Sequence, residues 1–119
     1  MDPVRLARGL KVLAVPARVR IVQLLKGRAL CVNALTARLN ITQGAVSQHL
    51  RILRDAGFVV DAKRGCFVHY RLNEEALAEW REHIGMLLSP QSGAGEDTKG
   101  ARTCAAAKTR NKGARSRET

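Results

Sequence analysis

The sequence predicts an α+β domain that is mostly α-helical, in which a two-stranded β-hairpin separates the last helix from four earlier ones. Three observations support this class. Apolar residues recur at helical spacing over most of the first 57 positions, a β-branched and aromatic stretch follows, and helical spacing then returns as far as Pro90. A chain of 119 residues has room for one small domain of this kind.

Two helices are expected before Gly27. The first should cover residues 3–14, because Asp2 suits the N-cap position and Pro3 suits the first helical position. Its apolar side consists of three leucines at helical spacing, which are Leu6, Leu10 and Leu13. The second helix should begin at Pro16. The side chains expected to face the core from this second helix are Val19, Val22, Leu24 and Leu25.

The next two helices are expected to form a closely connected pair. One should cover residues 31–39, and the other should begin after Thr42, whose side-chain oxygen can accept a hydrogen bond from the next turn. Asn40 suits a left-handed turn between them, and Gly57 suits the C′ position that ends the second of the two. The apolar residues of this pair that are expected in the core are Leu35, Leu39, Val46, Leu50 and Leu53.

The outward face of the helix after Thr42 has the chemistry of DNA recognition. It presents amides, a hydroxyl and guanidinium groups, and it lacks carboxylates until Asp55. Glutamine can form two hydrogen bonds with adenine, serine serves several bases, and arginine holds phosphates. At Gly44 the missing side chain would let the backbone approach a phosphate. A solvated helix face is the alternative, and the positive charge and the hairpin favour DNA. The residues of this helix that are expected to contact DNA are Gln43, Gly44, Ser47, Gln48, Arg51 and Arg54.

A two-stranded hairpin is expected next. Its strands should lie at residues 58–60 and 66–72, on either side of a five-residue basic tip at 61–65. Lys63 and Arg64 at this tip either contact the DNA backbone or minor groove, or only keep the tip soluble. Beside a recognition helix, DNA contact is the favoured interpretation.

A last helix is expected from its N-cap, Asn73, to Pro90. Its apolar residues form a heptad-like seam of Leu77, Trp80, Ile84 and Leu87. Residues 91–119 have no apolar periodicity and are rich in Lys and Arg, so they are expected to form a disordered basic tail after a domain of residues 1–90. This tail is either a solvated extension or a polycationic arm that adds salt-sensitive affinity for DNA.

The charge balance favours a polyanionic partner. A net charge of +11 at pH 7 points to nucleic acid first and to an anionic membrane second. No run approaches the roughly 18–20 apolar residues of a spanning helix, and the N-terminus lacks a signal-peptide core. A protein of the prokaryotic cytosol or nucleoid, with reduced thiols and no membrane partner, is therefore expected. No Ser-His-Asp, Cys-His or paired-carboxylate arrangement stands out, so neither an enzyme nor an enzyme substrate is expected.

This order of helices, β-wing and final helix is a winged helix-turn-helix, and four segments of the chain resemble the ArsR family of bacterial and archaeal metalloregulators. The segments are residues 10–21, 30–35, 42–50 and 53–59, within a resemblance that covers about residues 5–88. The resemblance implies a homodimeric repressor that binds a palindromic operator in double-stranded DNA and leaves it when an inducer binds. It also implies that the first and last helices form the dimer interface, through Leu6, Leu10, Leu13, Leu77, Trp80, Ile84 and Leu87.

The residues that hold metal ions in the family are not matched in this chain. Arsenic- and lead-type members carry Cys-Val-Cys at the start of the third helix, where this chain reads Cys31-Val-Asn33, and an amide is a poor substitute for a soft thiolate. Members that sense transition metals use an Asp-x-His and a later His with Glu or His on the last helix. That helix offers Glu79, Glu82 and His83 here, which is a different pattern.

The three cysteines leave the inducer open. A thiophilic metal or metalloid such as As(III) would be held by Cys31, Cys66 and Cys104, because the tail can reach the domain. Alternatively, two thiols oxidise and shift the dimer, or the cysteines only pack as small apolar side chains and the regulator works without an inducer. An architectural protein that coats DNA without operator choice is a further alternative.

Overall fold

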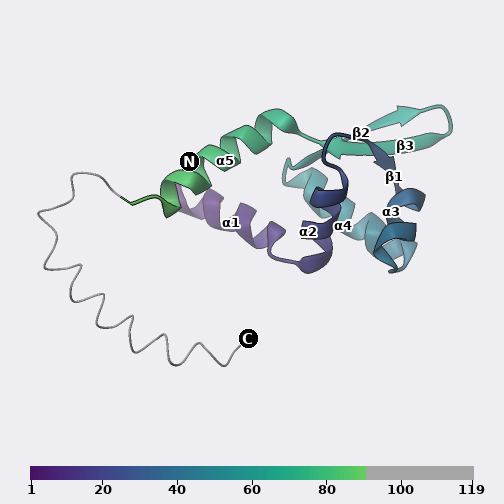
Figure 1. The fold of residues 1–119 in the computed structure, drawn as a ribbon, viewed down its shortest axis with the longest axis horizontal. Helices are drawn as coiled ribbons and strands as arrows, with labels where there is room; N and C mark the ends of the chain where they lie inside the picture. The colour runs from purple at the N-terminus through teal and green to yellow at the C-terminus, as the bar shows by residue number, and fades with distance from the viewer. Residues whose placement is uncertain (91–119) are drawn as a thin grey trace, which may run out of the picture. The chain divides into compact units, whose positions relative to one another are not determined.

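Five helices and a three-stranded antiparallel sheet make up residues 1–90, the part of the chain that the structure, a computed structural model, describes (Figure 1). Residues Met1–Leu87 form one compact unit. The elements in chain order are α1 (Pro3–Leu13), α2 (Pro16–Leu24), β1 (Leu30–Cys31), α3 (Val32–Leu39), α4 (Gln43–Asp55), β2 (Val59–Arg64), β3 (Phe67–Leu72) and α5 (Glu74–Leu88). This order confirms the predicted winged helix-turn-helix. The predicted basic tail at 91–119 lies outside the described residues.

The helix starts follow the predicted caps. The side chain of Asp2 accepts a hydrogen bond from the amide of Arg5 at 2.8 Å, and that of Thr42 accepts one from the amide of Ala45 at 3.1 Å. The Asn73 side chain likewise accepts from the amide of Ala76 at 3.2 Å. Each cap satisfies an amide that the first helical turn leaves free. Val15, which precedes α2, makes no such side-chain bond.

The end of α4 also follows the prediction. Gly57 has φ of +88°, a conformation that glycine adopts without the steric cost of a side chain. The Gly57 amide donates to the Arg54 carbonyl at 2.9 Å, and the Phe58 amide donates to the Leu53 carbonyl at 2.9 Å. This pair of bonds is the Schellman motif, and it directs the chain from α4 straight into the wing.

The core lies between α2, α3, α4 and the start of the hairpin. Its buried apolar residues are Ile21, Leu25, Leu35, Leu39, Val46, Leu50, Leu53, Phe58, Val59, Leu72 and Trp80. The prediction for α2 was partly wrong, because Val19 is 42% exposed and Ile21 is fully buried instead. Ile21 and Leu25 are four residues apart and share one face, whereas Val19 lies two residues before Ile21 and points away from it.

The sheet contains one strand that the sequence did not predict. Cys31 was expected in the third helix, but Leu30 and Cys31 form β1, which pairs antiparallel with β3 at Tyr70 and His69. The strand order is β1-β3-β2. The helix α3 therefore begins one residue later, at Val32, with Cys31 at its N-cap position.

The wing is longer than expected. The predicted five-residue tip at 61–65 is wrong, because β2 continues to Arg64, which pairs with Phe67. Only Gly65 and Cys66 connect the strands, and Gly65 has the positive φ (+62°) that tight hairpin turns require. Both faces of the outer wing are exposed to solvent. Its strands therefore need no alternation of apolar and polar residues, which is the pattern from which strands are predicted.

Candidate nucleic-acid interface

The helix α4 presents one polar, cationic face to solvent. Val46, Leu50 and Leu53 are fully buried on its opposite side, which fixes the direction of the outward face. All six residues of this helix that were expected to contact DNA are exposed: Gln43, Gly44, Ser47, Gln48, Arg51 and Arg54. The structure therefore brings these side chains together on one surface, as an amphipathic helix should.

The first residue of α4 is held by its neighbour helix. The Gln43 side-chain amide donates to the Asn33 side-chain oxygen at 3.0 Å. Asn33 lies in the first turn of α3, so this bond joins the starts of α3 and α4. Sequence reasoning treated Asn33 only as the replacement of a metal-binding cysteine and missed this contact, because it depends on how the two helices cross.

Arg54 connects α4 to the wing. Its guanidinium lies 3.4 Å from the Asp61 carboxylate on β2 and 3.6 Å from that of Asp55. All three side chains are well exposed, so these pairs contribute little stability, about 1 kcal/mol or less. By contrast, Arg51 has no ion pair with any residue in 1–90, which leaves its charge available to a phosphate.

The wing carries two more exposed cations. Lys63 and Arg64 are exposed on β2, opposite Val68 and Phe67 of β3. Neither forms an ion pair within the described part of the chain. Phe67 is 55% exposed, an apolar side chain in a position that sequence reasoning did not single out.

Arg18 is half-buried and is held by two hydrogen bonds within the domain. Its Nε donates to His49 Nδ1 at 3.1 Å, and its Nη1 donates to the Val12 carbonyl at 3.1 Å. It therefore links α1, α2 and α4. Burial, and then the nearby Arg18 charge, lower the pKa of His49 from its ordinary value. A neutral His49 is the form whose Nδ1 can accept this bond.

The first and last helices lie side by side (Figure 1). Arg5 of α1 forms an ion pair with Glu79 of α5 at 3.4 Å and lies over the Trp80 ring, 5.7 Å from its centroid. Trp80 is only 6% exposed, and its ring centroid is 5.1 Å from that of Phe58. Most of its surface is thus covered within its own chain. Gly9 of α1 supplies the space, because a Cβ there would overlap the Trp80 ring.

The other residues expected in a dimer interface are more open. Five are partly buried, namely Leu6, Leu10, Leu13, Leu77 and Ile84, and Leu87 is 57% exposed. A groove of about 610 Å³ lies between α1, the end of α4 and α5. Its apolar lining comes from Gly9, Val12, Ile52, Ala56 and Trp80. Its charged lining comes from Arg5, Arg8, Lys11, Arg18 and Asp55.

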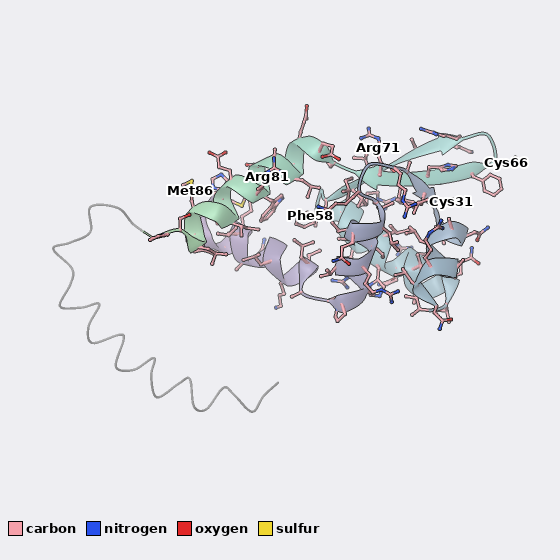
Figure 2. The ribbon with its side chains drawn as sticks, viewed as in Figure 1. Cys31, Phe58, Cys66, Arg71, Arg81 and Met86 are labelled. Atoms are coloured by element: carbon pink, nitrogen blue, oxygen red, sulfur yellow. The ribbon has the colours of Figure 1, made fainter. Side chains whose placement is uncertain are left out.

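Two of the three cysteines line one smaller pocket of about 150 Å³. Both are free thiols, with Cys31 half-buried and Cys66 exposed. Figure 2 shows Cys66 at the turn of the wing and Cys31 near the start of α3. Asn33 and Gln43 line the same pocket. No group of three or more His, Cys, Asp or Glu residues suited to a metal ion occurs in residues 1–90, and Cys104 lies outside them.

None of the five helices described in residues 1–90 combines the length and hydropathy that a membrane-spanning segment needs.

Comparison with known proteins supports the same interpretation of the fold. The family model described as "Bacterial regulatory protein, arsR family" matches residues 15–60. The chain is 42% identical over 88 residues to the "HTH-type transcriptional repressor SmtB" of Mycobacterium tuberculosis. This alignment covers 74% of the present chain and 61% of that protein. The chain thus spans about three fifths of the length of this relative.

Two solved structures are similar. One is titled "Possible transcriptional regulator for arsenical resistance"; it has a TM-score of 0.63 and 41% identity, and the match covers 68% of this chain and 84% of that one. The other is the homodimeric winged helix-turn-helix DNA-binding domain of a Mycobacterium bovis protein, with a TM-score of 0.59 and 25% identity, covering 70% and 77%. These relatives are named as regulators of transcription and not as enzymes. With its winged helix-turn-helix and 41% identity over most of such a regulator, this chain belongs to the ArsR family of DNA-binding transcriptional regulators.

Proposed function

We propose that the chain is a repressor of the prokaryotic cytoplasm that binds a palindromic operator in double-stranded DNA as a homodimer. The observation that carries the proposal is the exposed polar face of α4 beside a cationic wing. A helix of this size fits the major groove of B-DNA, where base pairs are distinguishable by their hydrogen-bonding groups.

The exposed residues divide into two roles by their chemistry. Gln48 and Ser47 read base edges, since amides and hydroxyls form directed hydrogen bonds with them. Arg51, Lys63 and Arg64 hold phosphates, since their charges are unpaired within residues 1–90. Gln43 also reaches the DNA if it exchanges its bond to Asn33 for one to a base.

A second copy of the chain would fill the groove between α1 and α5. This groove has apolar lining from both α1 and α4. The exposed apolar side chains of α1 and α5, which are Val4, Met86 and Leu87, are those that an interface would cover. A two-fold dimer would place two recognition helices about 34–36 Å apart, one turn of DNA.

The DNA-reading role is tested by Gln48→Ala, with Gln23→Ala on the exposed side of α2 as the matched control. An operator is first selected from random DNA, and binding is then measured by fluorescence anisotropy for the operator and for random DNA. Gln48→Ala should lower the ratio of the two affinities about 10-fold or more, the value of a good bidentate pair, whereas Gln23→Ala should leave it unchanged. Equal losses on both DNAs would contradict base reading. A wild-type ratio near one would favour the architectural alternative.

The dimer is tested by Leu87→Asp, measured by sedimentation velocity. Leu87 is 57% exposed, so an aspartate there should leave the subunit folded while burying a charge in the interface. We expect a folded monomer with weakened operator binding. A sedimentation coefficient equal to that of the wild type would remove Leu87 from the interface. Trp80→Asp is not a clean test, because Trp80 is buried within its own subunit.

A further inference from the structure

We propose that Phe67, near the end of the wing, inserts into the minor groove next to the major groove that α4 enters, and partly unstacks one base step. The duplex bends at that step, and the protein thereby selects a deformable sequence there. This inference rests on the proposed function, because it adds a specificity-determining residue to the same DNA complex. The observation that suggests it is an aromatic side chain left 55% exposed beside two cations that have no ion pair within residues 1–90.

Packing within the subunit does not account for the position of Phe67. Apart from Val19, the exposed large apolar side chains of residues 1–90 fall into two groups. One group lies on α1 and α5, where a second copy is proposed to cover it, and the other consists of Phe67 and Val68 on the wing. Neither an aromatic ring nor a cation stacks on the Phe67 ring within the described part of the chain. The ring is thus available to a partner outside the subunit.

The outer wing is a narrow ribbon of two strands, which extends past β1 (Figure 1). The strand β1 pairs with β3 only at His69 and Tyr70, so Phe67 has β2 on one side and no strand on the other. Every residue from 61 to 68 is exposed. Ribbons of this kind read DNA grooves in other DNA-binding folds, whereas the minor groove, about 6 Å wide, is too narrow for a helix.

The strand register places a guanidinium group next to the ring. Arg64 lies directly opposite Phe67 in the antiparallel ladder, so the two side chains project from the same face of the ribbon. Lys63 and Val68 form the next pair, which projects from the other face. Arginine suits the negative potential of a minor groove, and a phenyl ring suits the apolar space between two base pairs. One face of the wing thus combines the side chains that minor-groove proteins use to hold and kink DNA.

Phe67 also borders the surface of α4 that is proposed to read bases. It lines the same pocket of about 150 Å³ as Gln43, the first residue of α4. A duplex with its major groove on α4 therefore presents its sugar–phosphate backbone to this pocket and its next minor groove to the wing. Asn33, which is bonded to Gln43 at 3.0 Å, adds an amide to the pocket. This continuity favours DNA over an anionic membrane, which is the other surface that an apolar and cationic ribbon enters.

Insertion would make one base step part of the recognised sequence without a hydrogen bond to either base pair. Pyrimidine–purine steps such as TA and CA unstack and kink easily, whereas A-tracts are stiff. The affinity of the wild type should therefore depend on the identity of the step under Phe67. A variant without the ring does not unstack the step, so its affinity should lose this dependence.

The insertion is tested with full-length protein and an operator selected from random DNA. The base analogue 2-aminopurine, whose fluorescence rises when it is unstacked, is placed at successive positions in and beside each half-site. In the wild-type complex we expect the fluorescence to rise at one step per half-site. Energy transfer between dyes at the two DNA ends should report a bend of about 20° or more for each inserted ring.

Two variants of Phe67 separate the ring from the strand that carries it. Phe67→Thr keeps a residue that favours strands but removes the wedge, so it should abolish the fluorescence rise and most of the bend. Phe67→Leu keeps an apolar wedge and should retain most of both signals. Because Phe67 is exposed, both variants should fold, and circular dichroism checks this before DNA is added.

Val68→Thr is the matched control, because it removes exposed apolar surface from the other face of the same ribbon without changing the size of the side chain. It should retain the fluorescence rise and the bend. An operator complex of the wild type with no unstacked position would overturn the insertion, and so would an equal bend in Phe67→Thr. An equal loss in Val68→Thr would overturn the specific role of Phe67.

The sequence selection is tested by changing the unstacked step, which we expect to be pyrimidine–purine, to AA. This change should weaken wild-type binding about 5-fold or more and should affect Phe67→Thr much less. Equal losses in the two proteins would overturn the selection.

Two further outcomes separate the possible failures. A wild type that binds no operator better than random DNA would contradict the proposed function and this inference with it, whereas a specific operator complex without unstacking would overturn the role of Phe67 alone. Vesicles of phosphatidylserine test the membrane alternative. If they bind the wild type but not Phe67→Thr, while both proteins bend DNA equally, the ring belongs to a membrane surface and the inference is wrong.

Discussion

Replacing Gly9 by alanine should destabilise the domain, because the added methyl group overlaps the Trp80 ring. An ideal Cβ at Gly9 would lie within 2.8 Å of three atoms of the six-membered ring, closer than carbon atoms pack. The ring cannot easily retreat, since Phe58 packs against it at 5.1 Å between centroids and is itself fully buried. Overpacking of this kind costs about 1–3 kcal/mol.

A second glycine allows this cost to be isolated. Gly44 also lies in a helix, and a Cβ there would have no atom within 4 Å. Gly→Ala in a helix otherwise stabilises by up to about 1 kcal/mol, because alanine loses less backbone entropy on folding. Both substitutions gain this propensity, so the difference between the two variants reports the overlap with Trp80.

The assay is urea unfolding at one fixed chain concentration, followed by the fluorescence of Trp80, the only tryptophan. Fixed concentration is needed because association would shift the apparent stability. We expect the free energy of unfolding of Gly9→Ala to be about 1–3 kcal/mol lower than that of Gly44→Ala. Its Tm should be lower than that of Gly44→Ala by about 4 °C or more. Equal stability of the two variants would refute the packing argument and would mean that α1 and α5 can separate at no cost.

Three further predictions concern charged groups. The pKa of His49 is lower in the folded chain than its unfolded value of about 6.5. Between these two pKa values the unfolded chain binds more protons than the folded one, so the free energy of unfolding decreases as the pH falls through this window. In urea titrations over that pH range, His49→Gln should lose less stability than the wild type. Asp61→Asn frees Arg54 from its 3.4 Å ion pair, so it should change stability by less than about 1 kcal/mol and tighten DNA binding in anisotropy, and weaker binding would contradict this. The double substitution Lys63→Gln and Arg64→Gln should make the slope of log affinity against log salt concentration shallower, by about 0.9 for each phosphate that the wing no longer neutralises. An unaltered slope would show that the wing does not contact DNA phosphates.

The features that were predicted well from the sequence are those that depend on residues only a few positions apart in the chain. The caps at Asp2, Thr42 and Asn73 each bond an amide three residues away, so the local pattern contains all the information needed. The strand β1 was missed because two residues cannot form a strand alone, and Leu30 and Cys31 do so only by pairing with β3 nearly 40 positions later. The shared pocket of Cys31 and Cys66 was beyond local pattern for the same reason.

In the proposed function, α4 would couple DNA recognition to subunit association, because the two parts of this helix would face different partners. Its first half carries Gln43, Ser47 and Gln48 on the exposed face, while Ile52 and Ala56 near its end line the groove beside α1. A second copy seated in that groove would therefore restrain the orientation of the same helix that is proposed to enter the DNA. The restraint is rigid over such a short distance, since α4 is a continuous helix of 13 residues whose buried side is fully packed. Any change that alters how α1 and α5 associate should thus alter operator affinity through the angle of α4, even when no residue that contacts DNA has changed.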